Sequence, residues 1–314
     1  MPRTRRSPRS SNRDSLCHNA LSPDDATLAT ASHSEPVDAD TVGVLLWDIT
    51  DPAHPRHLGG GLLGGTAAFR PHGRVLATAG GGRVLLWDTS GPAHPKRLGP
   101  PLNVEGPRIS AVAFSPDGHT LAAAVEQTQI YLWDTRNPAH PKRLGKPLTN
   151  TTDGVTDVAF SADGRMLGGT NHEYKGSFWG IGDPAHPKKL RNGSIGLLVD
   201  DGANSFGGVA FGPDGHTLAT AGDDEDVRLW DLTASGRPTL LGSPLTEHSK
   251  PVSAVAFSAD GRFLATGSQD GTARLWELNP ERAIRRLCAV TKHTLTEKEW
   301  RQYAGNIAYR PPCP

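Results

Sequence analysis

A tryptophan closes each of a series of apolar, β-like runs along the chain. These residues are Trp47, Trp87, Trp133, Trp179, Trp230 and Trp276, at intervals of 40, 46, 46, 51 and 46 residues. A unit of 40 to 50 residues that ends in Trp-Asp is typical of a β-propeller blade, in which each copy needs a neighbour to cover its apolar face. The period therefore predicts an all-β repeat fold.

A second marker precedes each tryptophan at a constant phase: Ser-Pro-Asp-Gly or a close relative. The copies are Ser22–Asp25, Arg70–Gly73, Ser115–Gly118, Ser161–Gly164, Gly212–Gly215 and Ser258–Gly261. Pro at the second and Gly at the fourth position favour a type I turn, so each marker predicts a hairpin between two strands. Six copies of both markers predict six blades.

The runs Val112–Gly118 and Val227–Asp231 resemble the WD-repeat family, and the resemblance covers roughly residues 15–291. It implies four strands in each copy, which in the sixth copy are residues 252–258, 262–267, 272–277 and 282–290. We therefore expect an all-β, six-bladed WD-repeat propeller. Seven blades are the alternative, because many family members have seven and close the ring with strands from both termini.

Both ends depart from the repeat. Residues 1–14 hold five arginines among Ser and Pro, which predicts a disordered basic tail before the propeller domain at 15–291. In residues 292–314, the capping box Thr296–Glu299 predicts a short helix over about 297–304 and then an extended tail. Trp300 and Tyr303 lie on one side of that helix, so we expect it to dock on the propeller. This ending resembles that of WD-repeat regions in actinobacterial signalling NTPases and regulators.

In the WD-repeat family a His, a Ser or Thr, an Asp and the Trp form a buried hydrogen-bonded tetrad that stabilises the blade. The resemblance implies that His248, Ser268, Asp270 and Trp276 form it in the sixth copy. The first three could also suggest a catalytic triad, but the match to the tetrad favours a structural role. The fifth copy has Gly222 at the Ser position.

No pattern of catalytic or metal-ligating residues emerges. Four Pro-Ala-His-Pro quartets occupy the same phase of successive copies, so their histidines cannot meet at one metal. Gly59–Gly64 fits G-x-G-x-x-G, but no βαβ unit surrounds it. The three cysteines lack zinc or redox spacing, and a Cys288–Cys313 bridge stays open as an alternative to free thiols. We expect no cofactor and no metal.

Charge and family resemblance together point to protein partners. Lys plus Arg (33) equals Asp plus Glu (33), and no apolar run could span a membrane, so we expect neither nucleic acid nor membrane as a partner. Family members usually bind partners on the narrow face. The corresponding residues here are Arg108, Glu126, Thr156, His172, Asp223, Ser253 and Gln269. Glu225 joins them because residues 223–226 are the densest acidic cluster.

The sequence thus predicts a non-enzymatic, cytoplasmic scaffold that binds other proteins. One alternative is a propeller hydrolase or lyase with a site at the central channel, where Arg108 and Asp157 are the candidate polar groups. Another is the detached sensor region of a larger regulatory NTPase.

Overall fold

The structure is a computed structural model that describes ten segments of the chain. These are residues 19–31, 42–58, 61–106, 108–125, 129–149, 155–171, 175–189, 195–196, 206–232 and 238–278. All regular elements in these segments are β-strands. The basic tail at 1–14, the outer strand at 282–290, the helix at 297–304 and the Cys288–Cys313 pair lie outside the described residues.

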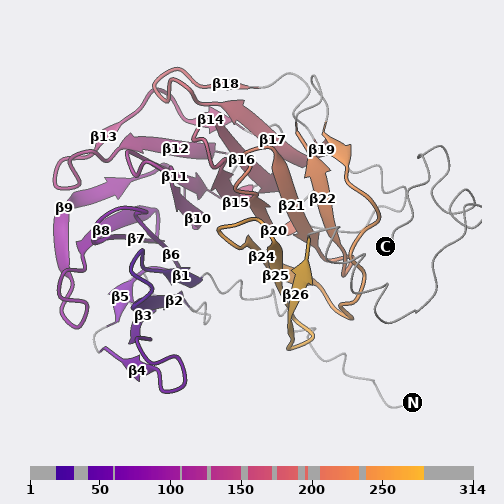
Figure 1. Cartoon of the computed structure of the whole chain (residues 1–314). Coiled ribbons are helices and arrows are strands. Elements are labelled where there is room, and N and C mark those ends of the chain that lie inside the picture. The colour runs from indigo at the N-terminus through magenta and orange to yellow at the C-terminus, as the bar shows by residue number, and fades with distance from the viewer. Residues whose placement is uncertain are drawn as a thin grey trace, which may run out of the picture.

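The strands form six antiparallel sheets, which are the six blades of a β-propeller (Figure 1). Blade 1 contains β1 (Asn19–Leu21), β2 (Thr27–Ala31), β3 (Val42–Asp48), β4 (Arg56–His57) and β5 (Leu62–Leu63). Blade 2 contains β6 (Thr66–Phe69), β7 (Val75–Gly80), β8 (Arg83–Asp88) and β9 (Lys96–Asn103). Blade 3 contains β10 (Ile109–Phe114), β11 (Thr120–Val125), β12 (Gln129–Asp134), β13 (Lys142–Arg143) and β14 (Leu148–Thr149).

The later blades follow the same order. Blade 4 contains β15 (Val155–Phe160), β16 (Met166–Asn171), β17 (Lys175–Gly180), β18 (Lys188–Lys189) and β19 (Ile195–Gly196). Blade 5 contains β20 (Phe206–Phe211), β21 (Thr217–Gly222), β22 (Val227–Asp231) and β23 (Thr239–Leu240), and blade 6 contains β24 (Val252–Phe257), β25 (Phe263–Ser268) and β26 (Ala273–Glu277). The prediction of six blades is confirmed, and so are the first three strands of the sixth copy.

The hairpin between the first two strands of a blade forms where the turn marker predicts it. In blade 3 the hydroxyl of Ser115 donates to Asp117 Oδ1 at 2.5 Å and accepts from the amide of Thr120 at 2.9 Å. Gly118 has a φ of 69°, a left-handed conformation that glycine adopts at little cost. Blades 4 and 6 repeat the Ser–Asp bond through Ser161 and Ser258. The turns therefore fix the register of the strands that carry the candidate site.

The core consists of apolar layers between successive blades. Ala77, Leu86 and Tyr131 belong to one such cluster between blades 2 and 3. Polar contacts add to it at the inner strands: Ser110 Oγ donates to the carbonyl of Val155 in the next blade at 2.5 Å. Blades 2 to 5 each pack against a neighbouring blade on both faces, so their turns and loops project from a rigid structure.

Candidate functional site

Blade 6 contains a chain of hydrogen bonds that links β25 and β26 to the turn between them and to the segment before β24. The Trp276 indole N–H donates to Thr266 Oγ1 at 3.0 Å, and Thr266 Oγ1 lies 2.7 Å from His248 Nε2. On the other side of the imidazole, His248 Nδ1 lies 2.9 Å from Asp270 Oδ2. Since the carboxylate of Asp270 can only accept, Nδ1–H donates to it, and in that tautomer of the neutral ring Nε2 accepts from the Thr266 hydroxyl.

The carboxylate of Asp270 anchors the far end of this network. It accepts bonds from the Thr272 hydroxyl at 2.6 Å, the Thr272 amide at 2.8 Å and the Ser249 amide at 3.2 Å. These bonds favour the ionised form, so the Thr272 hydroxyl first and His248 second hold the pKa of Asp270 well below its ordinary value. Asp270 thus ties the turn before β26 to the segment before β24.

The same Asp, His and hydroxyl order occurs in nucleophilic enzymes, but burial excludes that chemistry here. Thr266 is 2% exposed and His248 is 4% exposed. The hydroxyl already donates to the imidazole and accepts from the indole, and a substrate could not reach it. The network contains His248, Asp270 and Trp276, three of the four residues that the family resemblance implies for a structural tetrad.

The prediction that Ser268 is the fourth member of the network is wrong. The Ser268 hydroxyl donates to the carbonyl of Lys250 at 2.8 Å and accepts from the amide of Asp270 at 3.1 Å, and it makes neither the bond to Trp276 nor the bond to His248. The reason is register. Leu264 pairs with Trp276, so Thr266, two residues on and on the same face, is the diagonal neighbour of the Trp276 side chain, whereas Ser268 lies four residues from the paired position.

The Trp–Thr bond recurs in blades 1, 2 and 5 with the same register. The pairs are Trp47 with Thr30 at 2.9 Å, Trp87 with Thr78 at 3.0 Å, and Trp230 with Thr220 at 2.9 Å. Blades 3 and 4 have Ala123 and Gly169 at this position, two residues after the Leu that pairs with the Trp. The sequence signal was the Leu-Ala-Thr run, which gives this Thr a fixed phase.

In blade 3 a tyrosine fills the place of the network. Tyr131, fully buried, stacks on Trp133 with ring centroids 5.9 Å apart. Its hydroxyl donates to Gln129 Oε1 at 2.7 Å and accepts from the amide of Glu105 at 3.1 Å. This phenol therefore joins the third strand to the segment before the inner strand, as the imidazole does in blade 6.

Blade 5 replaces the histidine by an ion-pair cluster at residues 223–226, which we call the acidic turn. Buried Arg228 donates to Asp224 Oδ2 and, at 3.1 Å, to Asp226 Oδ2. Burial raises the pKa of Asp226, although Arg228 opposes this shift. Arg228 thus fixes the acidic turn through Asp224 and Asp226, while Asp223 and Glu225 are exposed.

Glu225 adopts a conformation that suits glycine. Its φ is 67°, in the left-handed region, and the equivalent position of blade 6, one residue after the turn aspartate, is Gly271 with a φ of 81°. A non-glycine residue there costs roughly 1–2 kcal/mol. A strained residue at an exposed, charged turn is a reason to suspect a function.

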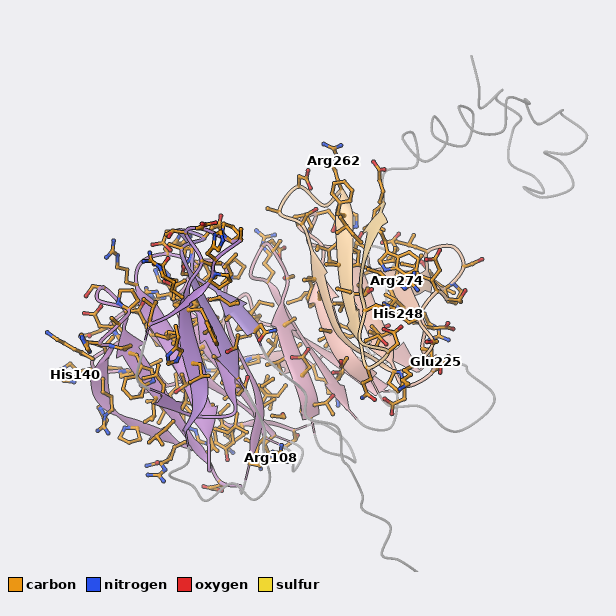
Figure 2. The ribbon with its side chains drawn as sticks, turned by 90° about the horizontal axis from the view of Figure 1, so that it is seen from below. Arg108, His140, Glu225, His248, Arg262 and Arg274 are labelled. Atoms are coloured by element: carbon orange, nitrogen blue, oxygen red, sulfur yellow. The ribbon has the colours of Figure 1, made fainter. Side chains whose placement is uncertain are left out.

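The other residues predicted to contact a partner are spread over several blades. Arg108 precedes β10 and is half-buried, Ser253 lies half-buried on β24, and Gln269 is exposed beside Asp270. Figure 2 shows Arg108 and Glu225 on the side of the molecule opposite to Arg262. Thr156 is 3% exposed, and its hydroxyl bonds to that of Thr170 at 3.0 Å. The prediction for Thr156 is therefore wrong, because its side chain offers no surface.

Two predicted positions, Glu126 and His172, lie outside the described residues. Sequence reasoning missed Arg228, whose arginine type alone does not distinguish a buried ion pair from a solvated charge. The feature that could have indicated Arg228 is its position: it pairs with Thr220 between β21 and β22, as Arg274 pairs with Thr266 in blade 6.

The candidate channel carboxylate, Asp157, is used by the backbone. Its Oδ1 accepts from the amide of Val158 at 2.8 Å, and its Oδ2 accepts from the amide of Val209 in the next blade at 3.2 Å. Oδ2 thus joins blade 4 to blade 5, while Oδ1 is paired within β15. This arrangement accounts for an acidic residue on an inner strand without a catalytic role.

A cavity of about 790 Å³ lies between blades 5 and 6, lined by residues that include Leu229, Leu241, Phe257 and Leu278. It borders Leu278, where the described part of the chain ends, so we assign no ligand to it. Within the described segments, no three His, Cys, Asp or Glu side chains are grouped to bind a metal ion. The same segments contain no helix with the length and hydrophobicity needed to cross a membrane.

Comparison with known proteins identifies the repeat. The family model described as "WD domain, G-beta repeat" matches residues 100–134, 202–231 and 239–277. These ranges contain the tryptophan-bearing strands of blades 3, 5 and 6. A search of curated protein sequences finds no match to the chain. The arrangement of its sheets makes this chain a six-bladed β-propeller, and three of its repeats, about a third of its residues, match the WD40 repeat.

Proposed function

We propose that this propeller is a non-enzymatic platform for binding other proteins, and that the acidic turn is a contact for a basic segment of a partner. The observation that carries the proposal is Glu225, which holds an exposed carboxylate in a left-handed conformation where the equivalent residue of blade 6 is glycine. WD40 propellers are generally scaffolds, which supports the wider role.

Local charge supports the acidic turn as a contact. The described residues of blades 5 and 6, 206–232 and 238–278, contain ten Asp and Glu but four Lys and Arg. The whole chain has no net charge, so this excess is local. A negative patch of this kind increases the association rate of a basic partner and selects its orientation.

Rigidity of the turn supports binding over catalysis. Arg228 bonds to Asp224 and Asp226, so the two exposed carboxylates between and beside them need little further ordering when a partner binds. The polar groups that resemble a catalytic set in blade 6 are buried and already paired.

The test is affinity capture from the source cell with the full chain as bait. Replacing Asp223 and Glu225 together with Lys should remove the captured partner and leave the melting temperature nearly unchanged, since both side chains are exposed. Asp224 is left intact because it pairs with Arg228.

A matched control separates charge from position. Glu225→Lys is compared with Glu105→Lys, because Glu105 is an exposed glutamate in the connection between blades 2 and 3 and the charge change is identical. The proposal requires that only Glu225→Lys weakens capture. Equal capture by the double variant and the wild type would refute the acidic turn as a contact.

A further inference from the structure

One face of blade 6 is apolar and uncovered within the described part of the chain. We call it the distal face; its exposed side chains are Ala254, Ala256, Ala265, Ala273 and Leu275. Leu275 is 68% exposed, whereas the equivalent residues of blades 1, 2 and 3 are 0%, 2% and 2% exposed. These equivalents, each one residue before the blade's Trp, are Leu46, Leu86 and Leu132. Burial of this position is thus the rule where another blade follows.

The opposite face of blade 6 packs against blade 5. Val255, Leu264 and Trp276 join a cluster with Ala219 and Leu229 of blade 5. Ala219 and Leu229 are the blade 5 equivalents of Ala265 and Leu275, and it is blade 6 that covers them. The distal face therefore has the apolar composition that the earlier blades bury against the next blade.

Blade 1 does not supply that layer in this structure. The indigo blade 1 and the yellow blade 6 lie apart in Figure 1. Blade 1 itself leaves Leu21 47% exposed on its first strand. The segment that precedes it, residues 1–18, contains five arginines and only Met1 and Leu16 as large aliphatic residues, so its composition does not suit an apolar face.

We propose that residues 287–314 of the same chain cover the distal face of blade 6. In blades 1 to 5 the fourth strand begins nine residues after the Trp, at Arg56, Lys96, Lys142, Lys188 and Thr239. The corresponding residue after Trp276 is Arg285. In every earlier blade the chain continues from the fourth strand into the first strand of the next blade, and that next blade packs against the blade before it. By the same path, we expect the residues after position 286 to reach the distal face.

The length and composition of this segment fit the surface. Its 28 residues exceed the 17 residues, 252–268, with which blade 6 supplies its first two strands. The segment contains Leu287, Val290, Leu295, Trp300, Tyr303, Ile307 and Tyr309, side chains able to remove the alanines and Leu275 from water. The surface gives a location to the docking that Trp300 and Tyr303 predict from the sequence.

Photo-crosslinking in the full chain tests the proposal. A photoreactive amino acid at position 275 should crosslink within one chain to residues 287–314, as mapped by mass spectrometry. Crosslinks to residues 19–48, a product of twice the chain mass, or no crosslink would each overturn it, because the covering layer would then be blade 1, a second copy or solvent. The same probe at position 240, an exposed leucine of β23, is the control and should not reach residues 287–314.

Limited proteolysis gives a second readout that does not depend on the probe. Leu275→Glu should increase the rate of tryptic cleavage after Lys292, Lys298 and Arg301 by about tenfold or more, because a carboxylate would replace a buried contact. Leu240→Glu should leave these rates unchanged. Equal rates in Leu275→Glu and the wild type would overturn the proposal.

Discussion

Thr266 Oγ1 accepts the indole N–H of Trp276 at 3.0 Å and lies 2.7 Å from His248 Nε2, so one hydroxyl joins the third strand of blade 6 to the segment before its first strand. Because the hydroxyl is buried, replacing it leaves two polar partners unpaired. Thr266→Val, which keeps the side-chain shape, should lower the free energy of unfolding by roughly 1–3 kcal/mol. Urea denaturation followed by tryptophan fluorescence measures the loss.

Ser268→Ala is the control for that experiment. It removes bonds to the Lys250 carbonyl and the Asp270 amide near solvent, and should cost less than Thr266→Val. His248→Ala should resemble Thr266→Val, again by roughly 1–3 kcal/mol. If Ser268→Ala were the most destabilising of the three, the assignment of Thr266 would be wrong.

Glu225→Gly should stabilise the protein by about 1 kcal/mol, because it relieves a left-handed conformation that non-glycine residues adopt at a cost. The matched change is Gly271→Ala in blade 6. An added Cβ there meets no atom within 4 Å, so its cost is conformational alone and has the opposite sign. Thermal unfolding of both variants checks the pair. A loss of stability in Glu225→Gly would show that the carboxylate contributes more to the fold than its φ costs.

Stability should decrease in acid below about pH 4. Several aspartates have pKa values below the ordinary 3.8. In four of them the largest cause is a hydrogen bond from a hydroxyl group: Ser22 to Asp24, Thr50 to Asp48, Ser258 to Asp260 and Thr272 to Asp270. A carboxylate with a depressed folded pKa contributes stability above its unfolded pKa and loses it as pH falls through the folded value. Asp226, with its raised pKa, acts in the opposite direction, as one group against the nine aspartates of the described residues whose pKa is lowered.

The measurement is the urea midpoint near pH 7, near pH 5 and near pH 3. Because these carboxylates titrate below about pH 4, we expect the urea midpoint to change little between pH 7 and pH 5 and to decrease at pH 3. A midpoint that stays constant or rises toward pH 3 would show that they are not linked to folding.

The sequence predicted the blades well because its two markers are local. The Ser-x-Asp-Gly turn is fixed by bonds within five residues, as in Ser115, Asp117 and Thr120. The sequence predicted Ser268 in the tetrad, whereas strand register places Thr266 there, and a polar residue at the right distance along the chain does not reveal register. The inner-strand position of Thr156 likewise predicts a surface contact, because the sequence does not show that its hydroxyl bonds to that of Thr170.

Blade 5 shows a different limit of the sequence. Its Asp224 matches the tetrad position, but its partner is Arg228, four residues on, and this pairing follows from the tight turn at Glu225. The left-handed φ of a glutamate has no signature in composition or period. The feature that most favours the acidic turn as a contact is therefore the backbone conformation of Glu225.

The most direct test of the central claim measures binding of a lysine-rich synthetic peptide to the purified full chain over a range of salt concentrations. We predict that the wild type binds the peptide, that the affinity falls as salt rises because the contact is between exposed charges, and that the variant with Lys at positions 223 and 225 loses most of this binding. The control Glu105→Lys should bind like the wild type. Equal, salt-dependent binding by the wild type and the double variant would contradict the account, because the acidic turn would then make no contribution to recognising a basic partner.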